Sequence, residues 1–304
     1  RYDKFYLSSR YGIKDILIYE NKFYISYSNQ VEKDCFNTSI LVSDLSLTIL
    51  KFEEFFTPKY CINKNNTYGE FKAMIAGGRM TPYKDKKILF SIGEYRFRDH
   101  AQDKSNSFGK IIAIDVKSKK FEIIAMGIRN SQGLYYDAKN DVIFFTDHGP
   151  QGGDEININT TLGGKIENYG WPISSYGEHY GGKTNFNKFE YEKAPLYKSH
   201  KDYGFVEPIK YFTQGIGISE LIKLNPKFSN SNKDEILVAS MGQDINDGDL
   251  SLYHFILNKD NIIEQQNILK INERIRDMIY IKDVNKIFLF FESAASIGIL
   301  NKQN

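Results

Sequence analysis

Three polar motifs follow one another near the middle of the chain and offer groups from which a binding or catalytic site can be built. They are Arg-Asn-Ser-Gln-Gly at residues 129–133, His-Gly-Pro-Gln-Gly-Gly-Asp-Glu at residues 148–155, and Asn-Tyr-Gly-Trp-Pro at residues 168–172. Together they supply a guanidinium able to grip a carboxylate through two parallel hydrogen bonds, several amides, two carboxylates and the only tryptophan. Such a stretch cannot form a buried strand, so we expect loops carried on short strands.

Arginine is used sparingly, which makes its positions informative. The chain has 32 lysines and 8 arginines, so lysine serves wherever only a positive charge is needed. Arg79, Arg129, Arg274 and Arg276 lie in glycine- or asparagine-rich turns or in the tight pair Arg-Ile-Arg. At such positions the planar guanidinium group can bind a carboxylate through two parallel hydrogen bonds. The alternative for each of the four is an ordinary surface arginine.

Composition narrows the class of partner. The 304 residues carry 40 basic and 38 acidic side chains spread along the chain, a formal net charge of +2. This balance excludes nucleic acid as the main partner and leaves small molecules and proteins. No run approaches the roughly 18 to 20 apolar residues that span a bilayer, so we expect no transmembrane segment. Because no linker or charge block divides the chain, we predict a single domain over residues 1–304.

The two cysteines, Cys35 and Cys61, flank a predicted hairpin formed by residues 38–41 and 47–52. A hairpin brings its two ends together, so these sulfurs can approach closely enough for a disulfide. The alternative is a pair of unpaired buried thiols.

Short apolar runs recur along the whole chain and predict its fold. They are about four to seven residues long, rich in Ile, Val, Phe and Tyr, and bounded by Asn, Asp, Gly or Lys. No segment shows sustained helical periodicity, which disfavours alternating strands and helices. At about 45 to 50 residues per blade, this length accommodates about six blades. We therefore predict an all-β fold, a six-bladed β-propeller of four-stranded antiparallel blades, with a large β-sandwich or a β-helix as the alternative.

The ordered motifs resemble those of soluble quinoprotein glucose and aldose sugar dehydrogenases, the glucose/sorbosone dehydrogenase family. That family consists of six-bladed propellers that use pyrroloquinoline quinone (PQQ) and calcium. Outside the three central motifs, shorter matches follow in order along most of the chain: Ile-Ala-Gly-Gly-Arg at 75–79, Gly-Glu at 93–94, Ala-Gln-Asp at 101–103, Gly-Lys at 109–110, Tyr-Gly at 176–177, Val-Ala-Ser at 238–240 and Arg-Ile-Arg-Asp at 274–277.

The resemblance implies how the cofactor would be held. Arg129, Arg274 and Arg276 would bind the carboxylates and the quinone oxygens of PQQ, a role that suits guanidinium geometry. Asn130 and Gln132 would hydrogen-bond its planar ring system.

The resemblance also implies roles within the second and third motifs. The main-chain carbonyl groups of Gly149 and Pro150 would bind calcium, which prefers oxygen ligands. Asp154 and Glu155 either order that loop through its backbone N–H groups or lie on a solvated surface. Trp171 either stacks on the cofactor or fills the core, and we favour the core slightly.

The chain departs from the family at the catalytic base. In the family, the histidine of a His-x-x-Gly-Arg loop takes the proton of the sugar hydroxyl, and here Ile75 occupies its position. Isoleucine cannot accept a proton, and losing a positioned base typically costs roughly 10²- to 10⁴-fold in rate. The catalytic residue is therefore unassigned, and His100, His148 and His179 are the candidate substitutes.

Two further positions differ from the family pattern. Met241-Gly242 stands where the family places a lysine that contacts the cofactor, so a second polar partner is missing. Glu94 replaces an aspartate, which keeps the charge and lengthens its reach.

Three functions follow as hypotheses. The first is PQQ- and calcium-dependent oxidation of a sugar or related alcohol by a periplasmic or secreted enzyme. The second, motivated by Ile75 and Gly242, is a catalytically degenerate propeller, a pseudoenzyme that acts as a ligand-binding or protein-interaction module. The third is a calcium-dependent propeller hydrolase or lactonase, because such chemistry also uses Asn, Asp and Glu near a central channel.

Overall fold

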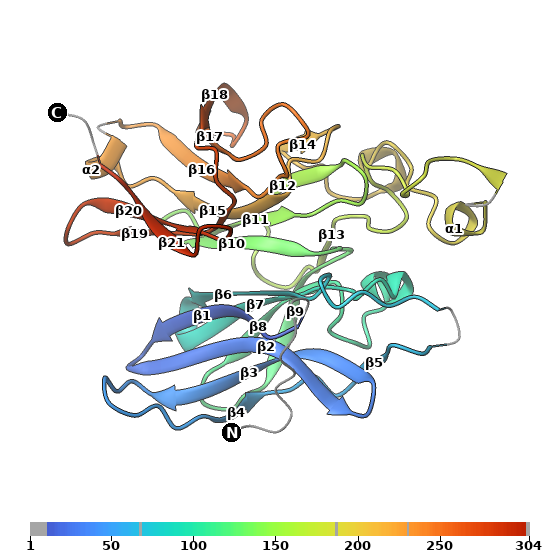
Figure 1. Ribbon diagram of the computed structural model, residues 1–304, viewed down its shortest axis with the longest axis horizontal. Coiled ribbons are helices and arrows are strands. Elements are labelled where there is room, and N and C mark those ends of the chain that lie inside the picture. Colours follow the sequence, from blue (N-terminus) through green and yellow to red (C-terminus); the bar gives the residue numbers. More distant parts are fainter. Residues whose placement is uncertain (1–10, 67–68, 186–187, 230, 302–304) are drawn as a thin grey trace. The chain divides into compact units, whose positions relative to one another are not determined.

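The computed structural model describes residues 11–66, 69–185, 188–229 and 231–301, and almost all regular structure in them is β (Figure 1). This confirms the prediction of an all-β protein. The described helices are single turns or little more: α1 (Lys188–Lys193), α2 (Pro226–Ser229), and the 3₁₀ turns η1 (Lys84–Lys86), η2 (Arg98–Gln102) and η4 (Lys201–Tyr203). None of the helices in these ranges has the length and apolar character needed to cross a membrane. The chain divides into two compact units.

Unit 1 comprises Arg1–Ser131, Thr161–Ser174 and His200–Val206. Its described strands are β1 (Ile13–Tyr19), β2 (Lys22–Glu32), β3 (Cys35–Asp44), β4 (Glu53–Phe56), β5 (Ile62–Asn63), β6 (Gly77–Tyr83), β7 (Lys87–Ile92), β8 (Lys110–Asp115), β9 (Phe121–Met126) and β13 (Glu167–Asn168). The first sheet has the order β1-β2-β3-β4 with β5 beside β3, and the second has the order β13-β9-β8-β7-β6. Apart from the parallel pair β13 and β9, neighbouring strands are antiparallel.

The core of unit 1 follows from the two-residue period of its strands. In β7, Ile88 and Phe90 point into an apolar cluster shared by both sheets, as do Ile112 and Ile114 of β8. All four are fully buried, and each such side chain stabilises the fold by roughly 1.5 to 3 kcal/mol relative to an exposed one. Strand β1 lies beside β6, so the two sheets meet along their first strands.

Unit 2 comprises Gln132–Thr160, Ser175–Ser199 and Glu207–Asn304. Its described strands are β10 (Ser131–Asp137), β11 (Val142–Asp147), β12 (Asp154–Asn159), β14 (Lys210–Phe212), β15 (Ile218–Lys223), β16 (Asp234–Ser240), β17 (Ser251–Leu257), β18 (Ile263–Lys270), β19 (Ile275–Ile281), β20 (Lys286–Phe291) and β21 (Ser296–Leu300). They form three sheets with the orders β10-β11-β12-β14, β15-β16-β17-β18 and β19-β20-β21.

Buried hydroxyl groups join neighbouring sheets of unit 2. The Thr146 hydroxyl of β11 donates to the Ser219 carbonyl of β15 over 2.7 Å, and the Ser219 hydroxyl donates to the Ile275 carbonyl of β19 over 2.5 Å. Two apolar clusters fill the space on either side of the β15–β18 sheet. Strands that meander outward within each sheet, with first strands adjacent, are the arrangement of β-propeller blades.

The prediction of six blades is wrong for the described residues, which form five sheets. Two lie in unit 1 and three in unit 2, and the last sheet has three strands instead of four. The physical reason is the connection between β12 and β14, which runs over residues 160–209. Among its described residues, the regular elements are the two-residue strand β13, α1 and η4. This connection is about as long as one blade but does not form one. An estimate of the number of blades from chain length is therefore too high. The prediction of one domain remains a prediction.

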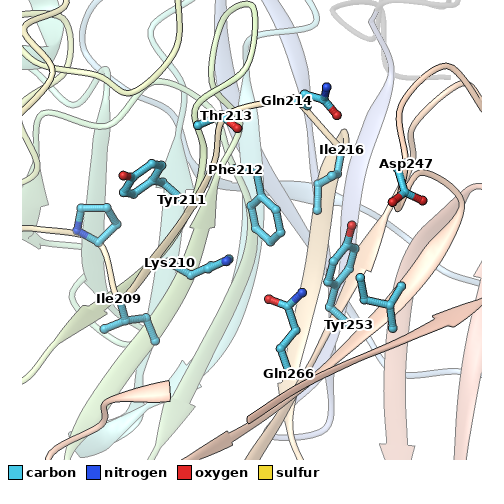
Figure 2. A pocket seen from close by; sticks show the side chains of 12 residues that line it. Ile209, Lys210, Tyr211, Phe212, Thr213, Gln214, Ile216, Asp247, Tyr253 and Gln266 are labelled. Atoms are coloured by element: carbon cyan, nitrogen blue, oxygen red, sulfur yellow. The ribbon is translucent and has the colours of Figure 1, made fainter. Parts of the chain in front are cut away.

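A pocket of about 580 Å³, here called the lateral pocket, lies in unit 2 between β14 and the outer strands β17 and β18 (Figure 2). Its lining residues are Pro208, Ile209, Lys210, Tyr211, Phe212, Thr213, Gln214, Ile216, Asp247, Tyr253, Gln266 and Ile268. None of the site residues predicted from the sequence is among them.

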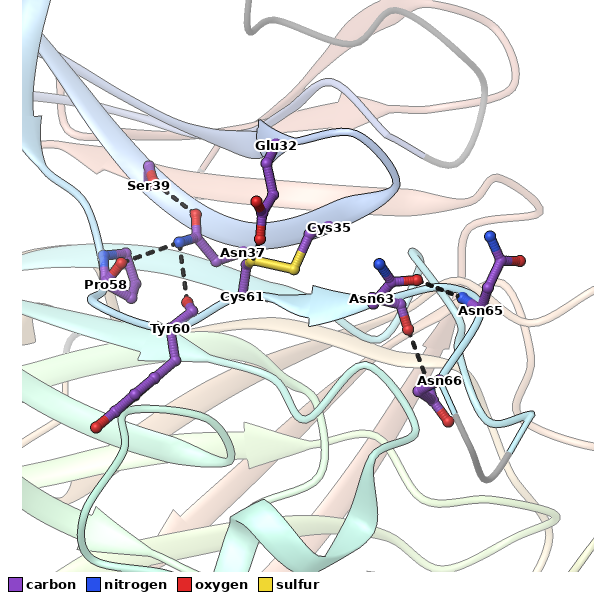
Figure 3. Close-up of a disulfide and its surroundings, with 10 residues drawn as sticks. All are labelled: Glu32, Cys35, Asn37, Ser39, Pro58, Tyr60, Cys61, Asn63, Asn65 and Asn66. Atoms are coloured by element: carbon purple, nitrogen blue, oxygen red, sulfur yellow. Dashed lines mark hydrogen bonds between the residues drawn. A yellow bond between two sulfur atoms is a disulfide. The ribbon is translucent and has the colours of Figure 1, made fainter.

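Cys35 and Cys61 form a disulfide, with Cα atoms 5.4 Å apart (Figure 3). Of the two strands predicted for the hairpin between these cysteines, the second is not formed. Residues 47–52 are not a strand, and β4 begins only at Glu53. The approach of the two cysteines follows instead from the pairing of β3 with β5, in which Phe36 faces Ile62.

Removing this crosslink is expected to destabilise unit 1. The disulfide closes a loop with a sequence separation of 26 residues, for which chain entropy gives a stabilisation of roughly 3 to 4 kcal/mol. A Cys35→Ser/Cys61→Ser double variant should lose about that free energy of unfolding in urea denaturation at neutral pH. The wild type in excess reductant should match it, whereas equal stability of oxidised and reduced protein would contradict the expectation.

Candidate functional site

In unit 1, the first and third motifs meet. The Arg129 guanidinium lies 5.4 Å from the ring centroid of Trp171, and both side chains are buried. The Trp171 ring is 4% exposed, and its indole N–H has no hydrogen-bond partner among the described residues. The Asn130 amide oxygen accepts the backbone N–H of Gly77 over 3.0 Å, which ties the first motif to the start of β6.

Ile75, at the family's base position, is buried and lies against the strand end that carries Glu94. The Tyr95 N–H donates to the Ile75 carbonyl over 2.8 Å, and the Gly93 N–H donates to the Ala76 carbonyl over 2.9 Å. A Cβ atom on Gly93 would collide with the Ile75 carbonyl, so this close approach requires glycine.

Glu94 is a fully buried carboxylate with an unusual environment. Neither of its oxygens makes a well-formed hydrogen bond within the described residues. Burial is the main reason that the pKa of Glu94 is raised, to about 7, and the charge of Glu70 raises it as well. The charges of Arg129 and Arg98 lower this pKa, and the backbone N–H of Arg96 lowers it least. Arg98 is already paired with Glu70 over 2.8 Å. Near neutral pH, Glu94 therefore exists in both protonation states.

In unit 2, the Arg-Ile-Arg pair shares a single carboxylate. Glu292 accepts from Arg274 over 3.0 Å through one oxygen and from Arg276 over 2.7 Å through the other. Burial acts to raise the pKa of Glu292, yet the two guanidinium groups outweigh it and hold the pKa below its ordinary value. Arg276 also donates to the Gln132 side-chain oxygen over 3.3 Å. Two predicted cofactor residues far apart in the sequence are thus in contact.

Arg274 contacts the segment that follows β16. Its guanidinium donates to the carbonyl groups of Met241 and Gly242. A Cβ atom on Gly242 would overlap the carboxylate of Asp249, so a lysine cannot stand there without rearrangement of the loop. Asp249 itself accepts the N–H groups of Ile245 and Asn246 over 3.1 Å and so closes this loop as a turn.

Asp154 organises the second motif from inside unit 2. This fully buried carboxylate accepts the N–H groups of Gly149 over 2.9 Å, Ile216 over 3.0 Å and Ile218 over 3.1 Å, and the His148 Nδ1 lies 2.8 Å from it. Burial acts to raise the pKa of Asp154, but His148 and these N–H donors lower it below its ordinary value. Asp154 is therefore a loop-ordering residue, the first of the two roles considered for it.

The neighbouring groups of this loop are partly engaged. The Pro150 carbonyl accepts the Tyr180 hydroxyl over 3.4 Å. One Glu155 oxygen accepts the Asn157 amide over 3.2 Å, and Glu155 is buried rather than solvated. The carbonyl groups of Gly149 and Pro150 remain the predicted calcium ligands.

The three candidate substitute bases differ in their surroundings. His100 stacks between Phe97 and Phe108, and burial lowers its pKa. The buried His179 ring donates its Nε2–H to the Ala194 carbonyl over 2.7 Å, a structural contact. His148 is 31% exposed and oriented by Asp154, so it has the most base-like setting of the three.

Arg79 and the groups around the disulfide have structural roles. Arg79 forms a buried ion pair with Asp15 over 3.3 Å, so its guanidinium group links β6 to β1 within unit 1. Glu32, Cys35 and Cys61 approach one another, but both sulfurs belong to the disulfide and offer no thiolate to a metal (Figure 3).

The predicted residues thus fall into two groups. Unit 1 contains Arg129, Asn130 and Trp171, and unit 2 contains Gln132, Gly149, Pro150, Arg274 and Arg276. Sequence reasoning missed Glu292, which follows the apolar strand β20 directly. A charged residue immediately after an apolar strand was the available signal.

The titration of Glu94 should be visible in protein stability. Between pH 4.5 and about 7, the unfolded chain loses this proton while the folded protein keeps it, so stability falls as pH rises through that window. The loss is on the order of 3 kcal/mol at 1.36 kcal/mol per pKa unit. The difference in unfolding free energy between wild type and Glu94→Gln should therefore change by this amount between pH 4.5 and 8. The exposed Glu264→Gln is the control, and a difference for Glu94→Gln that stays constant with pH would refute the expectation.

Comparison with known proteins agrees with these matches. The family model described as glucose/sorbosone dehydrogenase matches residues 4–297. Aldose sugar dehydrogenase YliI of Escherichia coli (strain K12) is 26% identical over 287 residues, which cover 88% of this chain and 71% of that protein.

Solved structures agree in fold. The apo-form of soluble aldose sugar dehydrogenase from Escherichia coli has a TM-score of 0.77 at 20% identity, covering 97% of this chain and 84% of that chain. The PQQ-bound form of aldose sugar dehydrogenase from Streptomyces coelicolor has a TM-score of 0.67 at 16% identity, covering 98% of this chain and 81% of that chain. The resemblance predicted from the motifs is confirmed: this chain belongs to the glucose/sorbosone dehydrogenase family.

Proposed function

We propose that the protein oxidises an aldose or a related alcohol with PQQ as the electron acceptor and calcium as its metal. The observation that carries this proposal is the contact of Arg276 with Gln132 beside Arg274, which unites three predicted cofactor residues in unit 2. A relative with a similar fold is described as PQQ-bound, which supports the choice of cofactor.

The residues present fit such a cofactor. PQQ is a planar, multiply anionic quinone, and the guanidinium groups of Arg129, Arg274 and Arg276 are planar donors suited to carboxylates. The unpartnered indole N–H of Trp171 is a further donor, buried beside Arg129. When bound, PQQ supplies the chemistry of accepting a hydride from the substrate carbon.

Glu292 sets the net charge around Arg274 and Arg276 in unit 2. Two guanidinium groups and one carboxylate leave a net charge of +1, so an anionic ligand is still attracted. Glu292 also fixes both arginine side chains, which reduces the entropy lost when they bind a ligand. Its role is to hold the arginines in place without neutralising them.

His148 is the group we assign to take the substrate hydroxyl proton. Its Nδ1 faces the ionised Asp154, which favours the tautomer with a proton on Nδ1 and the basic lone pair on Nε2. A base oriented by a buried carboxylate is a recurring catalytic arrangement. The buried His179 ring is committed through Nε2 to the Ala194 carbonyl, and the His100 ring stacks on two phenylalanines and pairs through Nδ1 with the Asn106 amide.

Calcium would bind the carbonyl oxygens of Gly149 and Pro150. The N–H of Gly149 is held by Asp154, which fixes the direction of the peptide groups in this turn. Main-chain oxygens at a turn suit a hard cation.

The disulfide supports the proposal of a periplasmic or secreted location. Disulfides form and persist in oxidising compartments and are rare in the cytosol.

Cofactor binding is tested by titrating the purified protein with PQQ and calcium and recording the quinone absorbance or the heat of binding. Arg276→Lys should weaken PQQ binding by roughly ten- to a hundredfold, because the two-point guanidinium contact is lost while the charge remains. The matched control is Arg79→Lys, whose guanidinium serves an internal ion pair. Absence of saturable PQQ binding by the wild type would end the proposal.

Turnover tests the assignment of His148. With PQQ, calcium, a panel of aldoses and a dye acceptor, His148→Asn should lower kcat by roughly 10²- to 10⁴-fold and leave PQQ affinity unchanged. The control is His254→Asn, since His254 forms a comparable pair with Glu235 over 2.6 Å in the same unit. If His148→Asn retains full turnover, another residue takes the proton, and if the wild type binds PQQ without turnover, the pseudoenzyme hypothesis gains.

A further inference from the structure

The lateral pocket of unit 2 has walls set by strand alternation. In β14, Lys210 and Phe212 point to one side while Tyr211 points to the other, where it stacks on Tyr176 at 3.7 Å. Figure 2 shows Lys210, Phe212, Tyr253 and Gln266 pointing toward a common space.

The opposite wall comes from the β17–β18 pair. Tyr253 faces Ile268 across the two strands, and Phe255 faces Gln266, so these side chains share one surface. Phe212 meets the Tyr253 ring edge-on at 5.2 Å. The pocket therefore combines aromatic and aliphatic side chains with polar ones. Its volume of about 580 Å³ is within the range of roughly 300 to 1,000 Å³ for small-molecule sites.

Tyr253 is the most informative residue of the pocket. The residue is 2% exposed as a whole, but its hydroxyl is not one of the sealed polar atoms without a partner, so the hydroxyl is accessible where Tyr253 borders the pocket. Burial raises the pKa of Tyr253 to about 12, with further contributions from the charges of Asp249 and Asp247. The hydroxyl therefore stays protonated and can both donate and accept. Because no described side chain occupies this hydroxyl, a ligand hydroxyl in the pocket can pair with it in place of water.

Four more polar side chains border the pocket without a side-chain hydrogen bond to the described residues: Thr213, Gln214, Asp247 and Gln266. They come from two separate loops and from β18. Lys210 and Asp247 carry opposite charges, so the pocket has no strong net charge.

This combination selects one ligand chemistry. A neutral sugar presents an apolar C–H face together with several hydroxyl groups that donate and accept, and the pocket offers complements to both. A phosphorylated ligand would require more positive charge, and an acyl chain would leave the polar groups unpaired. We propose that the lateral pocket is a binding site for a neutral carbohydrate of one or two sugar units, separate from the residues assigned to PQQ. This site does not depend on the proposed oxidation.

The experiment titrates the protein, without PQQ or calcium, with D-glucose, maltose and cellobiose and follows backbone amide shifts by NMR. At least one sugar should bind saturably and shift the amides of residues 210–214 and 266–268. Tyr253→Phe and Gln266→Ala should each raise its Kd by roughly two- to tenfold, as expected for one lost hydrogen bond. Gln266 is exposed on β18, so its replacement tests the site without disturbing the core.

Two controls separate this site from others. Tyr280→Phe removes a hydroxyl that already hydrogen-bonds Asn285 over 2.8 Å, so it should leave the Kd unchanged. Arg276→Lys, which should weaken PQQ binding, should also leave the sugar Kd unchanged. The proposal is overturned if no sugar binds, or if binding is indifferent to both Tyr253→Phe and Gln266→Ala. It is also overturned if Arg276→Lys abolishes sugar binding, which would place the sugar at the cofactor residues.

Discussion

The buried Asp154 is the interaction on which the site of unit 2 depends. A carboxylate without water is costly unless its oxygens are hydrogen-bonded, and Asp154 meets this requirement with three backbone N–H groups and the His148 ring. These donors lie at residues 148–149 and 216–218, so one side chain joins the second motif to the start of β15. The position of the turn at residues 148–150 and the orientation of His148 are consequences of this one satisfied charge.

Carboxylates paired with arginines occur in both units. Asp15 with Arg79 and Glu70 with Arg98 are buried ion pairs of unit 1, and Glu292 with its two arginines is the partly buried counterpart of unit 2. Such pairs specify geometry more than they add stability. Glu94 is the exception, because it is buried without a well-formed hydrogen bond. Charges left in this state are common at functional sites, and Glu94 lies in the same unit as Arg129.

The sequence allowed the all-β class and the loop-ordering role of Asp154 to be predicted, because each rests on local pattern or on matched motifs. The contact of Gln132 with Arg276, two residues predicted to bind the cofactor, was found only in the structure. The number of blades was not predictable, since the connection over residues 160–209 has the length of a blade but little regular structure. The strand expected at residues 47–52 failed because β3 finds its partners at β4 and β5 instead. Glu292 was missed because the pairing of β19 with β20 is what brings it next to Arg274 and Arg276. The lateral pocket was missed because its lining comes from strands that are far apart in the sequence.

The central claim is that Arg274 and Arg276 hold an anionic quinone beside the Gly149–Pro150 turn, and a crystal structure of the protein with PQQ and calcium tests it most directly. The account predicts both guanidinium groups on the quinone carboxylates or oxygens, with calcium on the carbonyl oxygens of Gly149 and Pro150. A structure in which PQQ binds elsewhere, with both arginines held only by Glu292 and no cation at the turn, would contradict it.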